Sequence, residues 1–318
     1  MYRKIMGFLE AWKESKYRKP LILQGARQVG KTYSILEFGR THYENVAYFN
    51  FETNPKLNET FEENISPDYL IPILSHIAGQ SIVKEKTLIV FDEVQLCERA
   101  LTSLKYFCEN APDYHIIVAG SLLGVAVNRA KFSFPVGKVD MKTLYPMDME
   151  EFMLALGEDD LVEQIKKCFQ NDTPLPSALH DDAMQLYRQY LVVGGMPECV
   201  MQFAETKNYI LVRHTQDTIL ASYLNDMSKY NNLNEIKKTR LVYDNITVQL
   251  SKKNTRFQYK LIKKGGRASE FENAIEWLCL SGIVSKVYKV EQIKKPLENY
   301  RDIDAFKIYV SDLGLLCA

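Results

Sequence analysis

Eight consecutive residues near the amino terminus have the spacing of a loop that holds phosphate groups. They are Gly25, Ala26, Arg27, Gln28, Val29, Gly30, Lys31 and Thr32. In such a loop the glycines let the backbone curl until several N–H groups point at a polyphosphate. Lys31 then supplies a positive charge for the β- and γ-phosphates, and Thr32 offers a hydroxyl to Mg²⁺. The pattern predicts binding of ATP with Mg²⁺, and Tyr33 extends the set of candidate nucleotide contacts.

Two acidic residues follow a second apolar run and supply what hydrolysis requires. The run 88–91 places Asp92 and Glu93 at the carboxyl end of a buried strand. In an open α/β sheet this edge also carries the phosphate loop. Asp92 is therefore our candidate for the Mg²⁺ carboxylate, and Glu93 and Lys31 are our candidate catalytic residues, with Glu93 as the base that activates water. The alternative interpretation is an acidic helix cap after a strand.

Other polar residues also stand at expected strand ends. Ser121 follows the apolar run 116–119 and is a candidate sensor of the γ-phosphate, although an ordinary turn serine fits the pattern as well. Asn50 and Glu52 end another expected strand, and the sequence assigns them no role. Four arginines are candidates for an arginine finger, namely Arg99, Arg129, Arg188 and Arg213.

Short apolar runs alternate with longer periodic segments between residue 21 and about residue 143. The expected strands are Leu21–Gln24, Val46–Phe51, Thr87–Phe91, His115–Ala119 and Val139–Leu144. The expected helices cover 31–40, 68–79 and 99–110, after a short helix within residues 1–14. Strands that alternate with helices imply a parallel sheet covered on both faces. With the phosphate loop after the first strand, we therefore expect an α/β fold, a P-loop NTPase core, over residues 1–147.

The character of the chain changes near Pro146. Asp148 and Glu151 form a helix-start pair, and no convincing strand follows before about residue 225. Residues 148–228 are therefore expected to form a helical subdomain, broken at 171–176 and at 194–197. Residues 229–318 are expected to hold three helices, the third opened by a capping box at Ser269, and then two strands. That order is typical of a winged helix, so we expect a winged-helix-like module there.

The composition bounds the class of protein. Hydrophobic residues make up 46% and charged residues 25% of the 318 residues, which is typical of a globular protein and excludes a disordered or fibrous chain. Six scattered cysteines form no C-x-x-C pair, which favours reduced thiols. No apolar run reaches membrane-spanning length, and the amino terminus lacks a secretory signal. We expect a cytoplasmic protein with no membrane partner, and a homo-oligomer is one open possibility.

Several further segments carry a family likeness. They are Phe91–Gln95, Ala119–Gly124, Ser133–Val139, Leu144–Met147, Glu151–Phe152, Gly194–Pro197 and Tyr309–Leu316. With the phosphate loop, they resemble a large group of prokaryotic predicted ATPases in which an AAA-type domain precedes a C-terminal domain of unknown function. That group is related to archaeal-type and signalling P-loop ATPases. The resemblance covers essentially the whole chain, and the phosphate loop is its most specific part.

The resemblance implies an ATPase core, a helical lid and a winged-helix-like module. The turn Gly194–Pro197 looks like the lid element that related signalling ATPases place over the nucleotide base, so Pro197 is a candidate adenine contact. Relatives often carry arginine where this chain has Lys138. They also usually continue into a restriction-endonuclease-like fold, whereas this chain ends at Ala318. We therefore expect a truncated form or a fragment, without nuclease activity.

The zero net charge hides a basic segment. Residues 229–295 contain 15 Lys and Arg against 6 Asp and Glu. Seven of the cations lie within 252–267, which suggests contact with a DNA backbone. The expected third helix argues against base reading, because it should expose Glu270, Glu272, Asn273, Glu276 and Trp277 and no cation. A solvated basic face or a surface for a protein partner fits equally well.

The sequence is compatible with three functions. The first is an ATPase whose turnover moves the lid and the basic module. The second is a nucleotide-dependent binding switch with negligible turnover. The third is a DNA-binding regulator without enzymatic activity.

Overall fold

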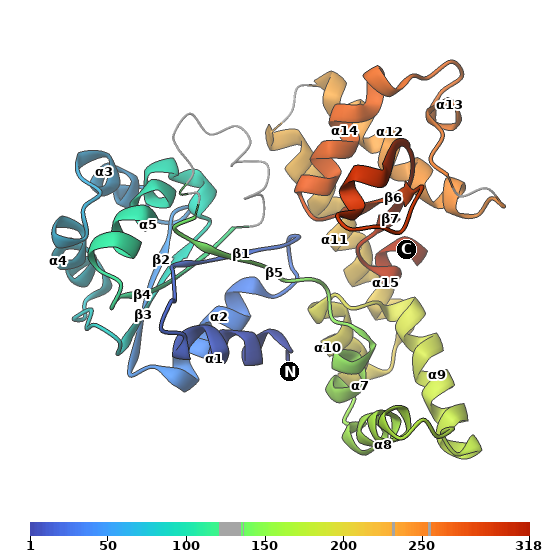
Figure 1. The fold of residues 1–318 in the computed structure, drawn as a ribbon, viewed down its shortest axis with the longest axis horizontal. Coiled ribbons are helices and arrows are strands. Elements are labelled where there is room, and N and C mark those ends of the chain that lie inside the picture. The colour runs from blue at the N-terminus through green and yellow to red at the C-terminus, as the bar shows by residue number, and fades with distance from the viewer. Residues whose placement is uncertain (121–134, 136, 231–232, 254–255) are drawn as a thin grey trace. The chain divides into compact units, whose positions relative to one another are not determined.

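The computed structural model describes residues 1–120, 135, 137–230, 233–253 and 256–318 (Figure 1). These residues form two compact units. The N-terminal unit is Arg3–Tyr145, and the C-terminal unit is Pro146–Ala318 together with Met1–Tyr2. Each unit contains its own sheet. The change of character expected near Pro146 thus coincides with the boundary between the units, while the further boundary at 228/229 stays a prediction.

The N-terminal unit is built on a five-stranded parallel sheet. Its strands are β1 Leu21–Gln24, β2 Asn45–Asn50, β3 Thr87–Asp92, β4 His115–Ala119 and β5 Asp140–Thr143. They lie in the order β2-β3-β4-β1-β5, and every neighbouring pair is parallel. This confirms the expected α/β fold of a P-loop NTPase core. Strand β4 pairs in parallel with both β1 and β3. The carboxyl ends of these three strands therefore lie at the same end of the sheet.

Helices cover both faces of this sheet (Figure 1). They are α1 Ile5–Glu14, α2 Lys31–His42, α3 Lys56–Glu63, α4 Pro67–Ala78 and α5 Glu98–Asn110, with a short 3₁₀ turn at Val94–Leu96. On one face α2 packs so closely that a Cβ at Gly39 would lie 3.1 Å from the Leu88 side chain. On the other face, Phe61 of α3 packs against Phe51 and Phe91. Helix α3 was not expected from the sequence, because its eight residues bury only Leu57 and Phe61, and two buried residues do not establish a helical period.

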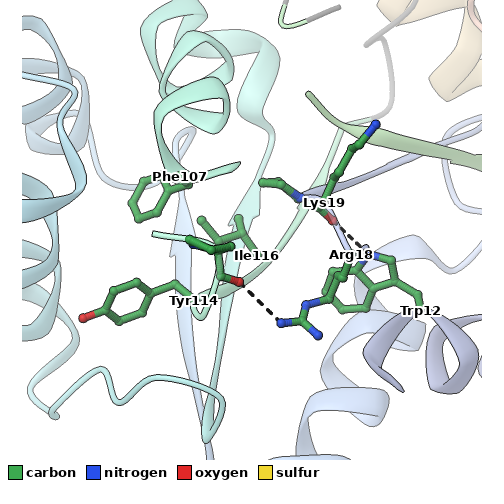
Figure 2. A pocket seen from close by; sticks show the side chains of 8 residues that line it. Trp12, Arg18, Lys19, Phe107, Tyr114 and Ile116 are labelled. Carbon is green, nitrogen blue, oxygen red and sulfur yellow. Dashed lines mark hydrogen bonds between the residues drawn. The ribbon is translucent and has the colours of Figure 1, made fainter. Parts of the chain in front are cut away.

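At the other end of the sheet, where β1 and β4 begin, α1 and the segment that follows it pack against the strands. Trp12 Nε1 donates to Lys19 O at 2.9 Å, and the Arg18 guanidinium lies over the Trp12 ring and reaches the carbonyl oxygen of Pro112. Figure 2 shows these side chains facing Tyr114 and Ile116. Side chains fill this crevice so completely that no water-sized space is left. We assign it a structural role.

The first part of the C-terminal unit is helical, as expected. Its helices are α7 Met149–Ala155, α8 Asp159–Gln170, α9 Ser177–Val193, α10 Pro197–Thr206 and α11 Tyr209–Tyr230. Among the described residues of 146–283 no strand occurs. The helix-start pair is confirmed: the Asp148 carboxylate accepts from Glu151 N, and the Glu151 side chain accepts from Asp148 N. The two expected breaks separate α8 from α9 and α9 from α10.

The remaining elements follow the expected order of helices and then strands. They are α12 Leu233–Leu250, α13 Tyr259–Ile262, α14 Ala268–Leu280, β6 Val284–Val290, a 3₁₀ turn at Leu297–Tyr300, β7 Arg301–Val310 and α15 Leu313–Cys317. Strands β6 and β7 are antiparallel. The assignment of a winged helix stays a prediction.

Two details expected for the third helix are wrong. Ser269 does not cap it, because α14 already begins at Ala268, and its N-cap residue Arg267 makes no side-chain cap. Trp277 is buried, with 4% of its surface exposed, rather than facing solvent. Helix α14 packs against both α12 and β6, so its buried stripe is wider than a one-sided helix would need. Glu272, Asn273 and Glu276 are exposed as expected.

Candidate nucleotide-binding site

The phosphate loop joins β1 to α2 through a backbone that only glycine can follow at its ends. Gly25 has a φ of 149°, and a Cβ there would lie 2.2 Å from Leu144 O in the segment after β5. Gly30 has a φ of 89° and is the N-cap residue of α2. Four backbone N–H groups at a helix start have no partner within the helix, and the helix dipole adds positive potential there. The loop therefore has the backbone geometry of an anion site.

Lys31 is buried inside this loop. Its Nζ donates to Gly25 O at 2.9 Å and to Ala26 O at 2.8 Å, and 7% of its surface is exposed. Burial lowers the pKa of Lys31 to about 8, although the negative charges of Glu93 and Asp92 act in the opposite direction. A buried ammonium held by two carbonyl oxygens can exchange these partners for phosphate oxygens, which carry full negative charge.

Asp92 at the end of β3 is joined to the phosphate loop by hydrogen bonds. Thr32 Oγ1 donates to Asp92 Oδ2 at 2.9 Å. Asp92 is 5% exposed. The hydroxyl and carboxylate form a set of hard oxygen donors, which suits Mg²⁺, an ion that commonly takes one or two protein oxygens and completes its shell with phosphate and water. The described residues contain no cluster of three or more His, Cys, Asp or Glu that could hold a metal ion.

Glu93 lies next to Asp92 in a constrained backbone position. Its φ is 51°, in the left-handed region, so its side chain does not continue the alternation of β3. The carboxylate accepts a hydrogen bond from Gln95 Nε2. Burial raises the pKa of Glu93, while the Gln95 hydrogen bond opposes the rise. A half-buried carboxylate with a raised pKa at the carboxyl edge of the sheet has the properties of a general base.

Two residues that the sequence analysis did not assign complete the site. Tyr48 OH donates to Asp92 Oδ2 at 2.8 Å, the same oxygen that accepts from Thr32, and Asn50 Nδ2 donates to the Tyr48 oxygen at 3.2 Å. Burial raises the pKa of Tyr48 to about 12, so its hydroxyl remains a donor at neutral pH. In the sequence, the only indication that Tyr48 could reach the site was its place on an expected strand, two residues before Asn50.

Arg3 supports the phosphate loop from the segment before α1. Its Nη1 donates to Val29 O at 2.9 Å and its Nη2 to Tyr145 O at 2.7 Å, and the side chain is 4% exposed. Arg3 therefore links the loop to the segment after β5. No sequence signal identified it, because a contact 26 residues away in the chain depends on the folded arrangement.

The remaining predicted contacts have different outcomes. Tyr33, in the first turn of α2, is 55% exposed, Arg27 is half-buried and Gln28 is exposed with a φ of 64°. Ser121 and Arg129 lie outside the described residues. Arg99 Nε donates to Phe61 O, and Arg213 pairs with Asp217. Pro197 is the first residue of α10 in the C-terminal unit. Its role as an adenine contact stays a prediction.

The turn before Pro197 packs tightly within its own unit. A Cβ at Gly195 would lie 1.9 Å from Met147 O, and one at Gly194 would lie 2.3 Å from Asp312 Oδ1. The turn Gly194–Pro197 and the segment that begins at Asp312 therefore form one packed cluster. Both segments belong to the resemblance described above. The close approach of Asp312 to Gly194 and of Met147 to Gly195 explains why a side chain would not fit at either glycine.

Two family models match the chain. Residues 17–153 match an AAA domain, and residues 184–318 match a domain of unknown function. A comparison with curated proteins gave no match. Among the described residues, no helix is both long and apolar enough to cross a membrane.

Solved structures are similar to this chain. A Walker-type ATPase of Pyrococcus abyssi is 13% identical and matches with a TM-score of 0.57, over 99% of this chain and 94% of that chain. The ORC2 protein of Aeropyrum pernix is 12% identical and matches with a TM-score of 0.47, over 99% of this chain and 92% of that chain. The first likeness supports the P-loop NTPase fold. In this chain a match to an AAA domain is therefore followed by a match to a domain of unknown function.

Proposed function

We propose that the protein binds ATP with Mg²⁺ in the N-terminal unit and hydrolyses it. The single observation that carries this proposal is the convergence of Lys31, Thr32, Asp92 and Glu93 at one edge of the sheet. Thr32 and Asp92 share a hydrogen bond of 2.9 Å, although 60 residues separate them in the chain. Such convergence is what phosphoryl transfer requires, because its catalysis consists almost entirely of positioning and charge stabilisation.

Each residue has a defined part in this proposal. The backbone N–H groups of residues 26–32 and Lys31 Nζ bind the phosphates, and Lys31 exchanges its bonds to Gly25 O and Ala26 O for phosphate oxygens. Thr32 Oγ1 and the Asp92 carboxylate would hold Mg²⁺, which would supply positive charge against the negative charge that develops on the phosphate oxygens. Tyr48 keeps the Asp92 carboxylate oriented.

Glu93 is the proposed base. Its carboxylate takes a proton from the attacking water as the oxygen of that water approaches the γ-phosphorus, and the bond to the ADP oxygen breaks. The hydrogen bond from Gln95 fixes the orientation of Glu93 meanwhile. Turnover would then move the helical lid, residues 148–228, with Pro197 on the adenine and Ser121 as a sensor of the γ-phosphate.

The rival proposal is a binding switch, in which ATP locks the lid and turnover is negligible. The proposals share the binding step and differ in the chemical step. We therefore test binding first, with a fluorescent ATP analogue on the parent protein and on Lys31→Ala. The proposal expects saturable binding that needs Mg²⁺ and is at least tenfold weaker in the variant. Equal binding by both proteins would contradict the assignment of the site.

A further inference from the structure

The hairpin β6–β7 of the C-terminal unit carries a hollow, and none of the residues that line it belongs to the N-terminal unit with its candidate nucleotide site. The hollow encloses about 530 Å³ and is open to solvent. Its lining combines an apolar floor with charged side chains. The lining residues are Lys253, Arg256, Val287, Tyr288, Lys289, Asp302, Ala305, Phe306, Lys307 and Tyr309. Four of these ten are cations and one is a carboxylate, so the hollow favours an anionic ligand.

The cations and the floor come from different segments that the fold brings together. Lys253 and Arg256 follow α12, Lys289 belongs to β6, and Lys307 belongs to β7. Val287 pairs with Lys307, and Ser285 pairs with Tyr309. Because paired residues of antiparallel strands point to the same face, Val287, Lys307 and Tyr309 share one face of the hairpin.

The floor offers aromatic surface that remains available to a ligand. Tyr309 is 39% exposed and Val287 is 50% exposed. The neighbouring rings are already held by cations: Lys286 Nζ lies 4.0 Å from the centroid of the Phe306 ring, and the Arg301 guanidinium lies 4.4 Å from that of Tyr288. Because Tyr288 pairs with Phe306 across the two strands, these two rings lie on the face of the hairpin opposite to Val287, Lys307 and Tyr309, so Tyr309 is the ring on which a base would stack.

We infer that this hollow binds single-stranded nucleic acid. Lys253, Lys289 and Lys307 would contact successive phosphates, and an unstacked base would lie on Tyr309. A positively charged groove with exposed aromatic rings is the arrangement used for single strands, because every base has a face that can stack. A duplex keeps its bases stacked internally, so it would gain little from the apolar floor. An acidic peptide would satisfy the cations but supplies no flat group for Tyr309.

The proposed binding surface is the hollow, and not the whole basic segment 252–267. Only Lys253 and Arg256 of that segment line the hollow. Lys260 and Lys264 belong to the same segment, are exposed and do not line it. They therefore provide a matched control for the lysines of the hairpin, since the same change of charge is made at a different place.

The test measures the affinity of a fluorescein-labelled oligothymidylate by anisotropy, at two salt concentrations. The double variant Lys289→Glu/Lys307→Glu is expected to bind at least tenfold more weakly, with a salt slope reduced by about 0.7 for each lysine. The control Lys260→Glu/Lys264→Glu should lose less than threefold. Tyr309→Ala should weaken binding about tenfold while Tyr309→Phe retains it, because stacking needs the ring and not the hydroxyl.

Four outcomes would overturn the inference. They are no binding by the parent protein, a larger loss in the control pair than in the hairpin pair, an unlabelled duplex that competes better than the single strand, and polyglutamate that competes equally well. The last outcome would indicate an acidic protein partner instead. Binding of the ATP analogue is measured on the same preparations, so failure here is distinguishable from failure of the proposed ATPase.

Discussion

The carboxylate of Asp312 accepts a hydrogen bond from the backbone N–H of Gly195 at 2.6 Å, across 117 residues of the chain. Its other oxygen accepts from Leu315 N at 2.9 Å, and the residue is 3% exposed. Burial raises the pKa of Asp312, while the backbone N–H donors oppose that rise. The bond joins the turn between α9 and α10 to the start of α15, so the helical segment and the end of the chain are held as one structure.

We predict that Gly194→Ala destabilises the C-terminal unit far more than Gly157→Ala. Both glycines have positive φ, 76° and 84°, so alanine is strained at each, and the ψ of −165° at Gly194 adds to the cost there because that backbone region is essentially restricted to glycine. A Cβ at Gly157 meets nothing within 4 Å, whereas one at Gly194 lies 2.3 Å from Asp312 Oδ1 and 2.7 Å from Gly314 N. Overpacking of this kind adds about 1–3 kcal/mol.

The measurement is thermal unfolding of the intact chain, and both substitutions are read from the same transition because both glycines lie in the C-terminal unit. The midpoint should fall clearly further for Gly194→Ala. Equal shifts would show that the contact with Asp312 does not hold the turn.

The Tyr48 hydroxyl offers a second prediction. Replacing Tyr48 with Phe removes the hydrogen bond to Asp92 Oδ2 but keeps the ring. A hydrogen bond to a charged group contributes about 1.5–3 kcal/mol, so we expect kcat to fall about tenfold or more and the Mg²⁺ concentration for half-maximal activity to rise. Binding of the ATP analogue at saturating Mg²⁺ should stay unchanged, because Tyr48 does not belong to the phosphate loop.

Tyr17→Phe is the matched control, since Tyr17 is 90% exposed. Steady-state phosphate release over a range of Mg²⁺ concentrations separates the two variants. If Tyr48→Phe matched the control in both kcat and Mg²⁺ requirement, Tyr48 would have no part in positioning Asp92.

The sequence was sufficient to predict the elements that repeat a strong pattern. All five strands of the parallel sheet were predicted to within two residues at either end, and β1, β3 and β4 gave the clearest pattern because buried strands appear as apolar runs. The partnership of Thr32 with Asp92 was also predictable, since each belongs to a motif with fixed roles. Helix α3 was missed because two buried residues in eight give no clear period.

Contacts made by the folded chain could not be predicted in the same way. Arg3 and Tyr48 belong to no motif, and their bonds to Val29 O and Asp92 Oδ2 arise only when distant segments meet. Trp277 was placed on the wrong side of α14 because a helix that packs against two neighbours buries more than one stripe. Local pattern thus predicts elements and motifs, and tertiary packing decides which other residues support them.

A third prediction concerns the pH dependence of nucleotide binding. Burial lowers the pKa of Lys31 to about 8. Below pH 8 the free protein already carries the ammonium that phosphate requires. Above pH 8 the lysine has lost its proton and must regain it on binding, so the affinity for ATP should fall as pH rises, approaching a tenfold loss per pH unit.

Titration with the ATP analogue between pH 7 and pH 9.5 checks this slope. Lys31→Arg is the informative comparison, because a guanidinium stays protonated throughout that range. Its binding should be weaker than that of the parent protein at pH 7 but nearly independent of pH. A parent protein whose affinity rose or stayed constant above pH 8 would contradict the role given to the Lys31 ammonium.

The most direct test of the proposed hydrolysis is the substitution Glu93→Gln. The amide keeps the size of the side chain and its contact with Gln95 but cannot accept a proton from water. Steady-state phosphate release with ATP and Mg²⁺ is measured for the parent protein and the variant, with binding of the ATP analogue as the control. We predict that the variant binds as the parent does and releases phosphate at least a hundredfold more slowly. Release that survives the substitution, or a parent protein that releases none, would contradict hydrolysis with Glu93 as its base.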